Sequence, residues 1–397
     1  MTQMLVVCDS ESYLKWAANL ASQLPGVDAD LVLLDTPIRP SPEQTGNAVA
    51  GTAWGDRPIP VLSGSALHRR LRSRAPELVL AAATGPVVAQ VHDLASRLPR
   101  RPALISGLPG MGLPATGKAM QYRLLGDGFI VHSPVEAVAY AQRMRECRIS
   151  PVILGTRLPM LHSPGLPLPR TEPITTVVFA AQAKVPATAP DRRAVLLALR
   201  DFARSDQGRR AVLKLRSRPG EQETHHERHS YLELLDDLID AGQLGRGEIE
   251  IGLGPMVDFL LPGSALATIS STAALEAMDR GLPTLFVDDF GVGPDLLNEA
   301  FAGSGCLGSL ADLASARIGH PHSEWLDVNY FQPRDEALLT GLLDLAERSR
   351  AGNLADPAPA RRRMRRLLLR SRLRLLAPRP VVHWVQWWRG RRRTALG

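Results

Sequence analysis

Short apolar runs alternate with helical stretches along the first part of the chain. Helical spacing of apolar residues is seen at Ser12–Leu24, Ala66–Arg74, Val87–Leu98 and Pro134–Arg145. The runs expected to form buried strands are Met4–Cys8, Leu31–Leu34, Leu78–Ala82, Ala103–Ser106, Phe129–His132 and Val152–Leu154. This alternation predicts a parallel sheet with helices on both faces.

A proline-rich stretch from Pro159 to Pro173 interrupts the alternation, which then resumes. Because proline neither pairs within a sheet nor continues a helix, this stretch is predicted to be a linker. Further strands are expected at Thr175–Ala181, Ala211–Leu215, Glu248–Ile251, Leu266–Ile269 and Thr284–Asp288. Further helices are expected at Arg192–Arg204, Ser230–Ile239, Thr272–Arg280, Asp295–Phe301 and Glu336–Arg348.

The predicted fold class is α/β, with two Rossmann-like doubly wound domains that face a cleft. Residues 1–160 would form the first domain, 161–174 the linker, 175–352 the second domain and 357–397 a basic, helical C-terminal tail. In open α/β sheets, ligands bind beyond the carboxyl ends of the strands. Candidate site residues are therefore sought directly after each strand.

The segment from Leu266 to Asp288 reads as a strand, a hydroxyl-rich turn, a short helix and a second strand. Ser270, Ser271 and Thr272 would stand at the amino end of the helix, which favours phosphate. Glu276, one turn further on, could accept both hydroxyls of a ribose. Ordinary helix capping explains part of the same pattern.

Three cations follow another predicted strand, at Lys214, Arg216 and Arg218. In an extended segment they would share one face, which suits a diphosphate or a carboxylated sugar. A solvated strand face is the alternative interpretation. Lysine occurs only at Lys15, Lys118, Lys184 and Lys214 in this arginine-rich chain, which draws attention to each of them.

The hydroxyl-rich turn followed by Ala-x-x-Glu-Ala-x-x-x-Gly-x-Pro resembles the donor-binding helix of GT-B glycosyltransferases. The same layout recurs in non-hydrolysing UDP-sugar epimerases and polyol-phosphate transferases. The resemblance implies that Ser270, Ser271 and Thr272 bind donor phosphates and that Glu276 binds the ribose. The segment from Lys214 resembles the Lys-x-His-Pro loop of bacterial sialyltransferases and capsule polymerases, although Arg218 stands in place of the histidine. The remaining candidates on the donor side are Glu221, His225 and Asp288.

The first domain offers candidates for the acceptor side and for a general base. Asp9 follows the first strand and Asp127 precedes a later one, and either could deprotonate an acceptor hydroxyl. The Gly/Pro-rich loop from Ser106 to Lys118 resembles the acceptor-side loop of such transferases. The residues assigned to the acceptor side are Ser10, Gly107, Pro109, Gly110, Arg123 and His132.

Neither a metal ion nor a cofactor is expected, and the nucleotide sugar would be a substrate. The histidines between His225 and His229 match none of the usual zinc spacings. The three cysteines, Cys8, Cys147 and Cys306, are far apart, which indicates a reducing compartment. No signal peptide or membrane-spanning run is recognised, and a cytoplasmic protein is therefore expected.

The net charge of +7 comes from the tail, because thirteen arginines and no acid lie between Arg361 and Arg393. Without them the rest of the chain carries a net charge of −6. Arginine together with Trp384, Trp387 and Trp388 predicts contact with an anionic membrane through residues 360–393. Folding of the tail back onto the first domain is an alternative, and nucleic acid is not an expected partner.

The predicted function is the transfer of a sugar from a nucleotide-sugar donor to a polysaccharide or lipid-linked acceptor at the inner membrane face. A nucleotide-sugar 2-epimerase or a polyol-phosphate transferase is the alternative within the same fold. A non-enzymatic protein that binds nucleic acid or membrane is the alternative from another class.

Overall fold

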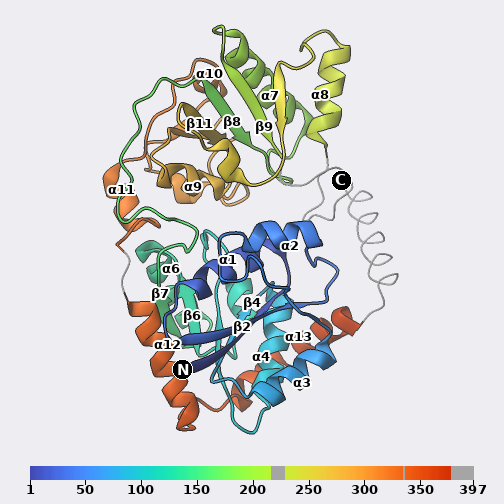
Figure 1. Cartoon of the computed structure of the whole chain (residues 1–397), viewed down its shortest axis with the longest axis vertical. Helices are drawn as coiled ribbons and strands as arrows, with labels where there is room; N and C mark the ends of the chain where they lie inside the picture. Colours follow the sequence, from blue (N-terminus) through green and yellow to red (C-terminus); the bar gives the residue numbers. More distant parts are fainter. Residues whose placement is uncertain (216–228, 334–335, 377–397) are drawn as a thin grey trace.

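Two parallel sheets with their helices form two lobes stacked along the long axis of the molecule (Figure 1). The computed structural model describes residues 1–215, 229–333 and 336–376 of the chain. The prediction of two α/β units is confirmed by this arrangement.

The first lobe contains a seven-stranded sheet in the order β3-β2-β1-β4-β5-β6-β7, and all neighbouring strands are parallel. Its strands are β1 (Thr2–Cys8), β2 (Val27–Leu34), β3 (Val61–Leu62), β4 (Leu78–Ala82), β5 (Ala103–Ser106), β6 (Gly128–Val131) and β7 (Val152–Gly155). The helices that follow these strands are α1 (Glu11–Ser22), α2 (Pro42–Val49), α3 (Gly64–Arg74), α4 (Gly85–Ala95), α5 (Gly117–Gln121) and α6 (Pro134–Glu146).

Helices bury both faces of this sheet, and the side chains of the central strand β1 point to the two faces in turn. Met4 and Val6 pack with α1 on one face, whereas Leu5 and Val7 pack with α4 on the other. This is why β1 reads as a continuous apolar run rather than as an alternating one.

Two helices from the end of the described chain complete the first lobe: α12 (Ala337–Arg350) and α13 (Ala358–Leu376). Leu338, Leu342 and Leu345 of α12 are buried in the core of the first lobe. The predicted C-terminal limit of the second domain, residue 352, is therefore wrong, because the chain has returned to the first lobe before that point.

The second lobe contains a six-stranded sheet in the order β10-β9-β8-β11-β12-β13, again with parallel neighbours. Its strands are β8 (Thr176–Ala180), β9 (Arg210–Lys214), β10 (Ile249–Gly252), β11 (Ser264–Thr268), β12 (Thr284–Val287) and β13 (Leu307–Gly308). Its helices are α7 (Ala189–Arg204), α8 (Tyr231–Asp240), α9 (Ala273–Asp279), α10 (Leu310–Ala314) and α11 (Ser323–Val328), with 3-10 turns η1 (Met256–Phe259) and η2 (Glu299–Phe301).

The helix expected at Asp295–Phe301 is reduced to the turn η2, and that prediction is wrong. Leu297 adopts a left-handed conformation with φ 59°, which a continuing right-handed helix excludes. The Asn298 side chain instead bonds to the backbone of Gly291 and Gly293, so local polar bonds replace the helical ladder.

The two connections between the lobes meet beside the last residue of α9. The Asp279 carboxylate accepts hydrogen bonds from the backbone of His162, from Ser163 and from Arg157, in the connection that follows β7. The second connection is the segment between the last helix of the second lobe, α11, and α12. The Arg157 guanidinium also lies over the Phe331 ring of this segment, 5.4 Å from the ring centroid. The first connection is thus fastened to the end of α9.

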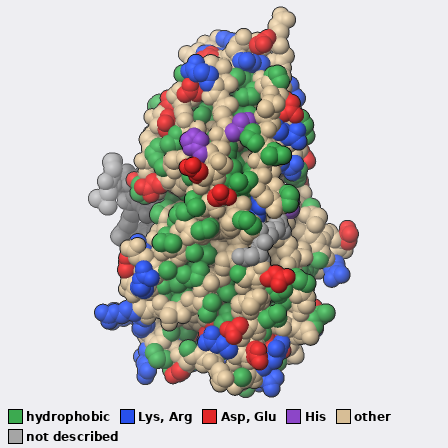
Figure 2. Space-filling view, turned by 90° about the vertical axis from the view of Figure 1, so that its left-hand side faces the viewer, with side chains coloured by type: hydrophobic (Ala, Val, Ile, Leu, Met, Phe, Trp, Pro, Cys, Tyr) green, Lys and Arg blue, Asp and Glu red, His purple; other side chains and the backbone are tan. Residues whose placement is uncertain are grey.

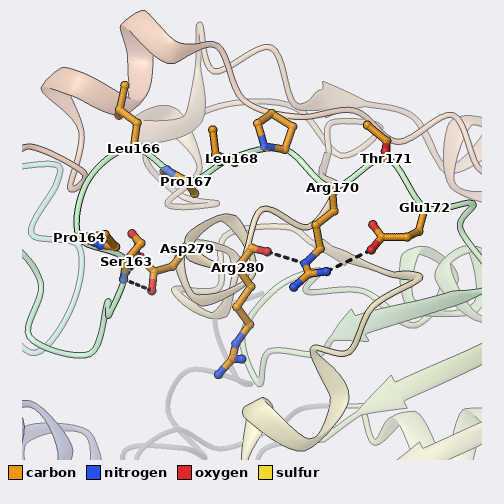
Figure 3. Close-up of a pocket in the computed structure, with 11 residues that line it drawn as sticks. Ser163, Pro164, Leu166, Pro167, Leu168, Arg170, Thr171, Glu172, Asp279 and Arg280 are labelled. Atoms are coloured by element: carbon orange, nitrogen blue, oxygen red, sulfur yellow. Dashed lines mark hydrogen bonds and ion pairs between the residues drawn. The ribbon is translucent and has the colours of Figure 1, made fainter.

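A surface pocket of about 650 Å³ lies between this connection and the end of α9 (Figure 3). Prolines and leucines of the connection arch over it, and Arg170 bonds to Glu172 and to the carbonyl of Arg280. Both acids that line the pocket are already bonded within the protein. The pocket is at the opposite end of α9 from Thr272, and it is a feature of the linker rather than the candidate active site.

The face turned toward the viewer in Figure 2 carries apolar side chains across the middle of the first lobe and charged side chains near its lower end. Among the described residues, no helix is both long enough and apolar enough to cross a bilayer.

Candidate active site

The carboxyl edges of the two sheets face each other, and side chains from the two lobes are in contact there. Lys15 of α1 donates a hydrogen bond from Nζ to Oε1 of Glu276 in α9, over 2.9 Å. Gly110 of the first lobe lies so close to Thr272 that a Cβ atom on this glycine would be 2.9 Å from the threonine Cγ2. Elements more than 150 residues apart in the sequence thus form one polar interface.

The turn between β11 and α9 is held by Gln182, which follows β8. Its Oε1 accepts from the backbone N–H of Ser270 at 2.9 Å, and its Nε2 donates to the Ser270 hydroxyl at 3.1 Å. The N–H of Ser271 donates to the Thr268 hydroxyl. The backbone N–H groups of Ser270 and Ser271 are therefore bonded within the protein, and the contact of these serines with donor phosphates stays a prediction. The exposed Thr272 side chain remains at the lobe interface.

Lys214 ends β9 and lies near Glu276. Its side chain is only 5% exposed, and its Nζ donates to the carbonyl of Leu215 and lies 5.5 Å from the centre of the Phe259 ring. Burial lowers the pKa of Lys214, while the carboxylates of Glu11, Asp258 and Glu276 act in the opposite direction. Cations and acids of both lobes therefore share one electrostatic environment.

Asp288, at the carboxyl end of β12, begins a turn in which its carbonyl accepts from the N–H of Gly291. The other predicted donor residues, Arg216, Arg218, Glu221 and His225, lie outside the described residues. Arg193 to Asp237 and Arg210 to Glu250 are exposed pairs on the lobe surface and have no part in this site.

Asp9 follows β1 at the carboxyl edge of the first sheet and is completely buried. Both the N–H and the hydroxyl of Thr84, which precedes α4, donate to the same oxygen, Oδ2. The other oxygen, Oδ1, has no hydrogen-bond partner within the described part of the chain. Burial raises the pKa of Asp9, and the two bonds from Thr84 offset part of this rise.

The Gly/Pro-rich loop of the first lobe is closely packed at three of its glycines. A Cβ on Gly107 would meet the Trp16 ring at 2.7 Å, and one on Gly112 would meet the Glu136 carboxylate at 3.2 Å. Because Trp16 is fully buried, the contact at Gly107 leaves no room for a side chain, whereas one at Gly110 or Gly112 would push against Thr272 or Glu136. Pro109 lies between two of these glycines and is half-buried.

Two of the predicted acceptor-side residues are buried within the first lobe. Arg123 is buried and donates to the carbonyls of Ala119 and Gly107. Ser10 is buried at the amino end of α1.

His132 is wholly buried and both of its ring nitrogens face groups of the protein, so its predicted role in binding the acceptor is wrong. Its Nε2 accepts a hydrogen bond from the indole N–H of Trp16 over 2.8 Å. The opposite nitrogen, Nδ1, therefore carries the proton and faces the carbonyl of Thr156. Burial lowers the pKa of His132 and keeps the ring neutral.

Asp127 is not a candidate base, and this prediction is wrong. It stands before β6, at the amino edge of the sheet, away from the lobe interface. Its carboxylate bonds to Arg101 at 3.0 Å and to the backbone N–H of Leu104 at 2.8 Å. It ties two strands together, and burial raises its pKa.

Four residues of the site were missed from the sequence: Lys15, Thr84, Glu136 and Gln182. The scarcity of lysine was a signal for Lys15, and the position of Thr84 and Gln182 after strands was a signal for both. Within the described ranges, no group of three or more His, Cys, Asp or Glu side chains is arranged to hold a metal ion.

Solved structures with the same arrangement of lobes are found by structural comparison. S. aureus MnaA, in its co-structure with UDP, superposes with a TM-score of 0.56 at 11% identity, over 89% of this chain and 98% of that one. The UDP-GlcNAc 2-epimerase from Methanocaldococcus jannaschii gives a TM-score of 0.55 at 9% identity, over 87% and 100%. At these identities the likeness concerns the fold, which is the two-lobed GT-B type.

Among curated protein sequences, none matches this chain. A family profile does match, over residues 4–345, and it spans both lobes and the connections between them. The predicted resemblance of the chain to GT-B glycosyltransferases is confirmed by this match together with the fold. The chain belongs to the family described as "Putative glycosyltransferase (DUF6716)".

Proposed function

We propose that this protein transfers a sugar from a nucleotide-sugar donor to a hydroxyl of a polysaccharide or lipid-linked acceptor, without a metal ion or other cofactor. The observation that carries the proposal is the bond between Lys15 and Glu276, because it brings an acid from the second lobe and a cation from the first to one point. Membership of the glycosyltransferase family supports the same reaction class.

In this proposal the second lobe binds the donor. Glu276 accepts the ribose hydroxyls once Lys15 has moved from it, and the released ammonium then stands beside the donor diphosphate. Lys214 adds a second cation, and the Thr272 hydroxyl can donate to a phosphate. Such groups stabilise the charge that develops on the leaving diphosphate.

The first lobe binds the acceptor and supplies the base. Asp9 Oδ1 accepts the proton of the attacking hydroxyl, since Thr84 occupies only Oδ2. Because Gly110 touches Thr272, the lobes must part here to admit substrates and then close again to exclude water.

We expect Glu276→Ala to weaken nucleotide binding by about tenfold to a hundredfold, the loss expected when a hydrogen bond to a charged group is removed. Thermal-shift screening against UDP, GDP, CMP and CDP identifies the base, and calorimetry then gives the affinity of each variant. Glu250→Ala is the matched control, because it removes an exposed carboxylate of the same lobe that is paired with Arg210.

A melting temperature that no nucleotide raises would contradict the proposal. The alternative reaction on this fold is 2-epimerisation, which is supported by the epimerase from M. jannaschii. Incubation with the UDP-sugar alone separates the two, since an epimerase converts it without an acceptor and a transferase does not.

We further propose that the enzyme works at the inner, anionic face of a membrane. Met364 and Leu368 of α13 cannot face lipid, because both are buried against the first lobe. The opposite side presents Arg362, Arg365 and Arg366 to solvent. This arginine face of α13 is the described part of the predicted membrane contact, and residues beyond 376 lie outside the described chain.

Replacing all three arginines of this face by glutamine is expected to weaken binding to vesicles with anionic lipid by about a hundredfold, at ~1 kcal/mol for each charge. Vesicle co-sedimentation at physiological salt measures this. A triple substitution of Arg209, Arg246 and Arg317 in the second lobe controls for net charge. Equal loss in both variants, or tighter binding to a DNA fragment than to vesicles, counts against a membrane partner.

A further inference from the structure

Glu136, at the start of α6, is a buried acid that joins three separate segments. Its Oε1 accepts from the backbone N–H of Gly112 at 2.5 Å and from the Tyr330 hydroxyl at 2.8 Å. Its Oε2 accepts from the backbone N–H of His132 at 2.8 Å. The side chain of Glu136 is thus the shared partner of the Gly/Pro-rich loop and of a residue far along the chain.

Tyr330 belongs to the second connection between the lobes, after α11. It is completely buried and has a φ of 71°, which is rare for an aromatic residue and is tolerated only where the surroundings fix it. The next residues reinforce the attachment, since Phe331 packs under Arg157 and the Gln332 amide donates to the carbonyl of His132. Burial and the nearby Glu136 charge raise the pKa of Tyr330, so its hydroxyl keeps the proton that it donates.

The Gly/Pro-rich loop, which Glu136 links to Tyr330, touches the second lobe. Gly110 lies against Thr272, and the Met111 side chain packs on the apolar cluster around α9 and β12. The Gly112 N–H donates to Glu136, and the Gly112 carbonyl accepts from the Tyr140 hydroxyl. These two bonds therefore set the position of the loop relative to α9.

We propose that Tyr330 is a positioning residue, which acts through Glu136 to set the Gly/Pro-rich loop against the donor lobe. When the lobes rotate, the second connection moves with them, and its hydroxyl transmits the movement to the loop. Tyr330 does not itself touch the substrates. The inference rests on the proposed function, in which the first lobe, to which this loop belongs, binds the acceptor.

Tyr330→Phe tests this, because it removes only the hydroxyl and keeps the ring. Amide exchange of residues 107–114 should become about tenfold faster, as expected when a bond to a charged acceptor is lost. With the nucleotide sugar that binds best as the probe, kcat should fall about tenfold while the KM for the donor stays within about twofold. Tyr140→Phe is the matched control, since it loosens the same loop without involving the connection.

The double variant Tyr330→Phe, Glu136→Gln separates action through Glu136 from a local effect. Its kcat should be no lower, and its amide exchange no faster, than in Glu136→Gln alone. Combining Tyr140→Phe with Glu136→Gln should lower kcat and speed exchange further. Additive losses for Tyr330, or unchanged exchange and kcat in Tyr330→Phe, would overturn the proposal. If no nucleotide sugar is used by the wild type, the proposed function fails, and the exchange measurements still decide the role of Tyr330.

Discussion

The Asp9→Asn variant is expected to lose about a hundredfold to ten-thousandfold of the transfer rate, the range attributed to a general base, and yet to be more stable than the wild type at neutral pH. Asparagine retains an oxygen that can accept both bonds from Thr84, so the local geometry is preserved. It cannot take a proton from an acceptor hydroxyl. The loss of activity and the gain in stability thus have the same origin in one buried carboxylate.

The sign of the stability effect follows from the pKa of Asp9, which burial raises in the folded state. Below about pH 4, the carboxyl is protonated in both folded and unfolded chains and costs nothing. As the pH rises, the unfolded chain ionises first, and the free energy of unfolding falls until the pH passes the folded-state pKa. The free energy of unfolding of Asp9→Asn does not fall in this way. Its excess over the wild-type value should grow between the unfolded-state and folded-state pKa values of Asp9 and stay constant at higher pH.

Urea unfolding of both proteins between pH 4 and pH 8 measures this difference, and turnover of the donor measures the rate. Asp237→Asn is the control, because that carboxylate is 60% exposed in its pair with Arg193. An Asp9→Asn protein that is active would remove Asp9 from the mechanism, and one whose stability follows the wild-type pH dependence would contradict the raised pKa of Asp9.

Asp279→Ala is expected to lower the free energy of unfolding by about 3–5 kcal/mol, the cost of leaving one member of a buried ion pair alone. The Arg157 and Asp279 side chains are 2% and 8% exposed, so water cannot replace the missing carboxylate. The backbone N–H groups of His162 and Ser163 lose their acceptor at the same time.

The matched control for this experiment is Arg170→Ala, which breaks the ion pair between Arg170 and Glu172 in the same pocket (Figure 3). Both members of that pair are more than 40% exposed, and its loss should cost below about 1 kcal/mol. Denaturant unfolding followed by fluorescence compares the two variants. Similar losses for both would mean that burial does not set the strength of the Asp279 contact.

The sequence was sufficient for the architecture because strands buried on both faces are continuous apolar runs, as at Met4–Cys8 and Leu78–Ala82. It also placed Glu276 in a short helix directly after a turn, as the structure has it. It could not show Lys15 beside Glu276, since no local pattern reports a contact across 261 residues. Nor could it separate Asp9 from Asp127, because a carboxylate next to a strand looks alike at either edge of the sheet.

Helix α12 was misplaced for a related reason, since its apolar spacing shows that one face is buried but not which sheet covers it. Its return to the first lobe has a consequence for biosynthesis. During translation the amino-terminal residues emerge first, but their sheet lacks part of its cover until Leu338, Leu342 and Leu345 have left the ribosome. The second lobe, whose sheet is formed wholly from the intervening residues, is synthesised in the meantime, so it can finish folding before the lobe that began first.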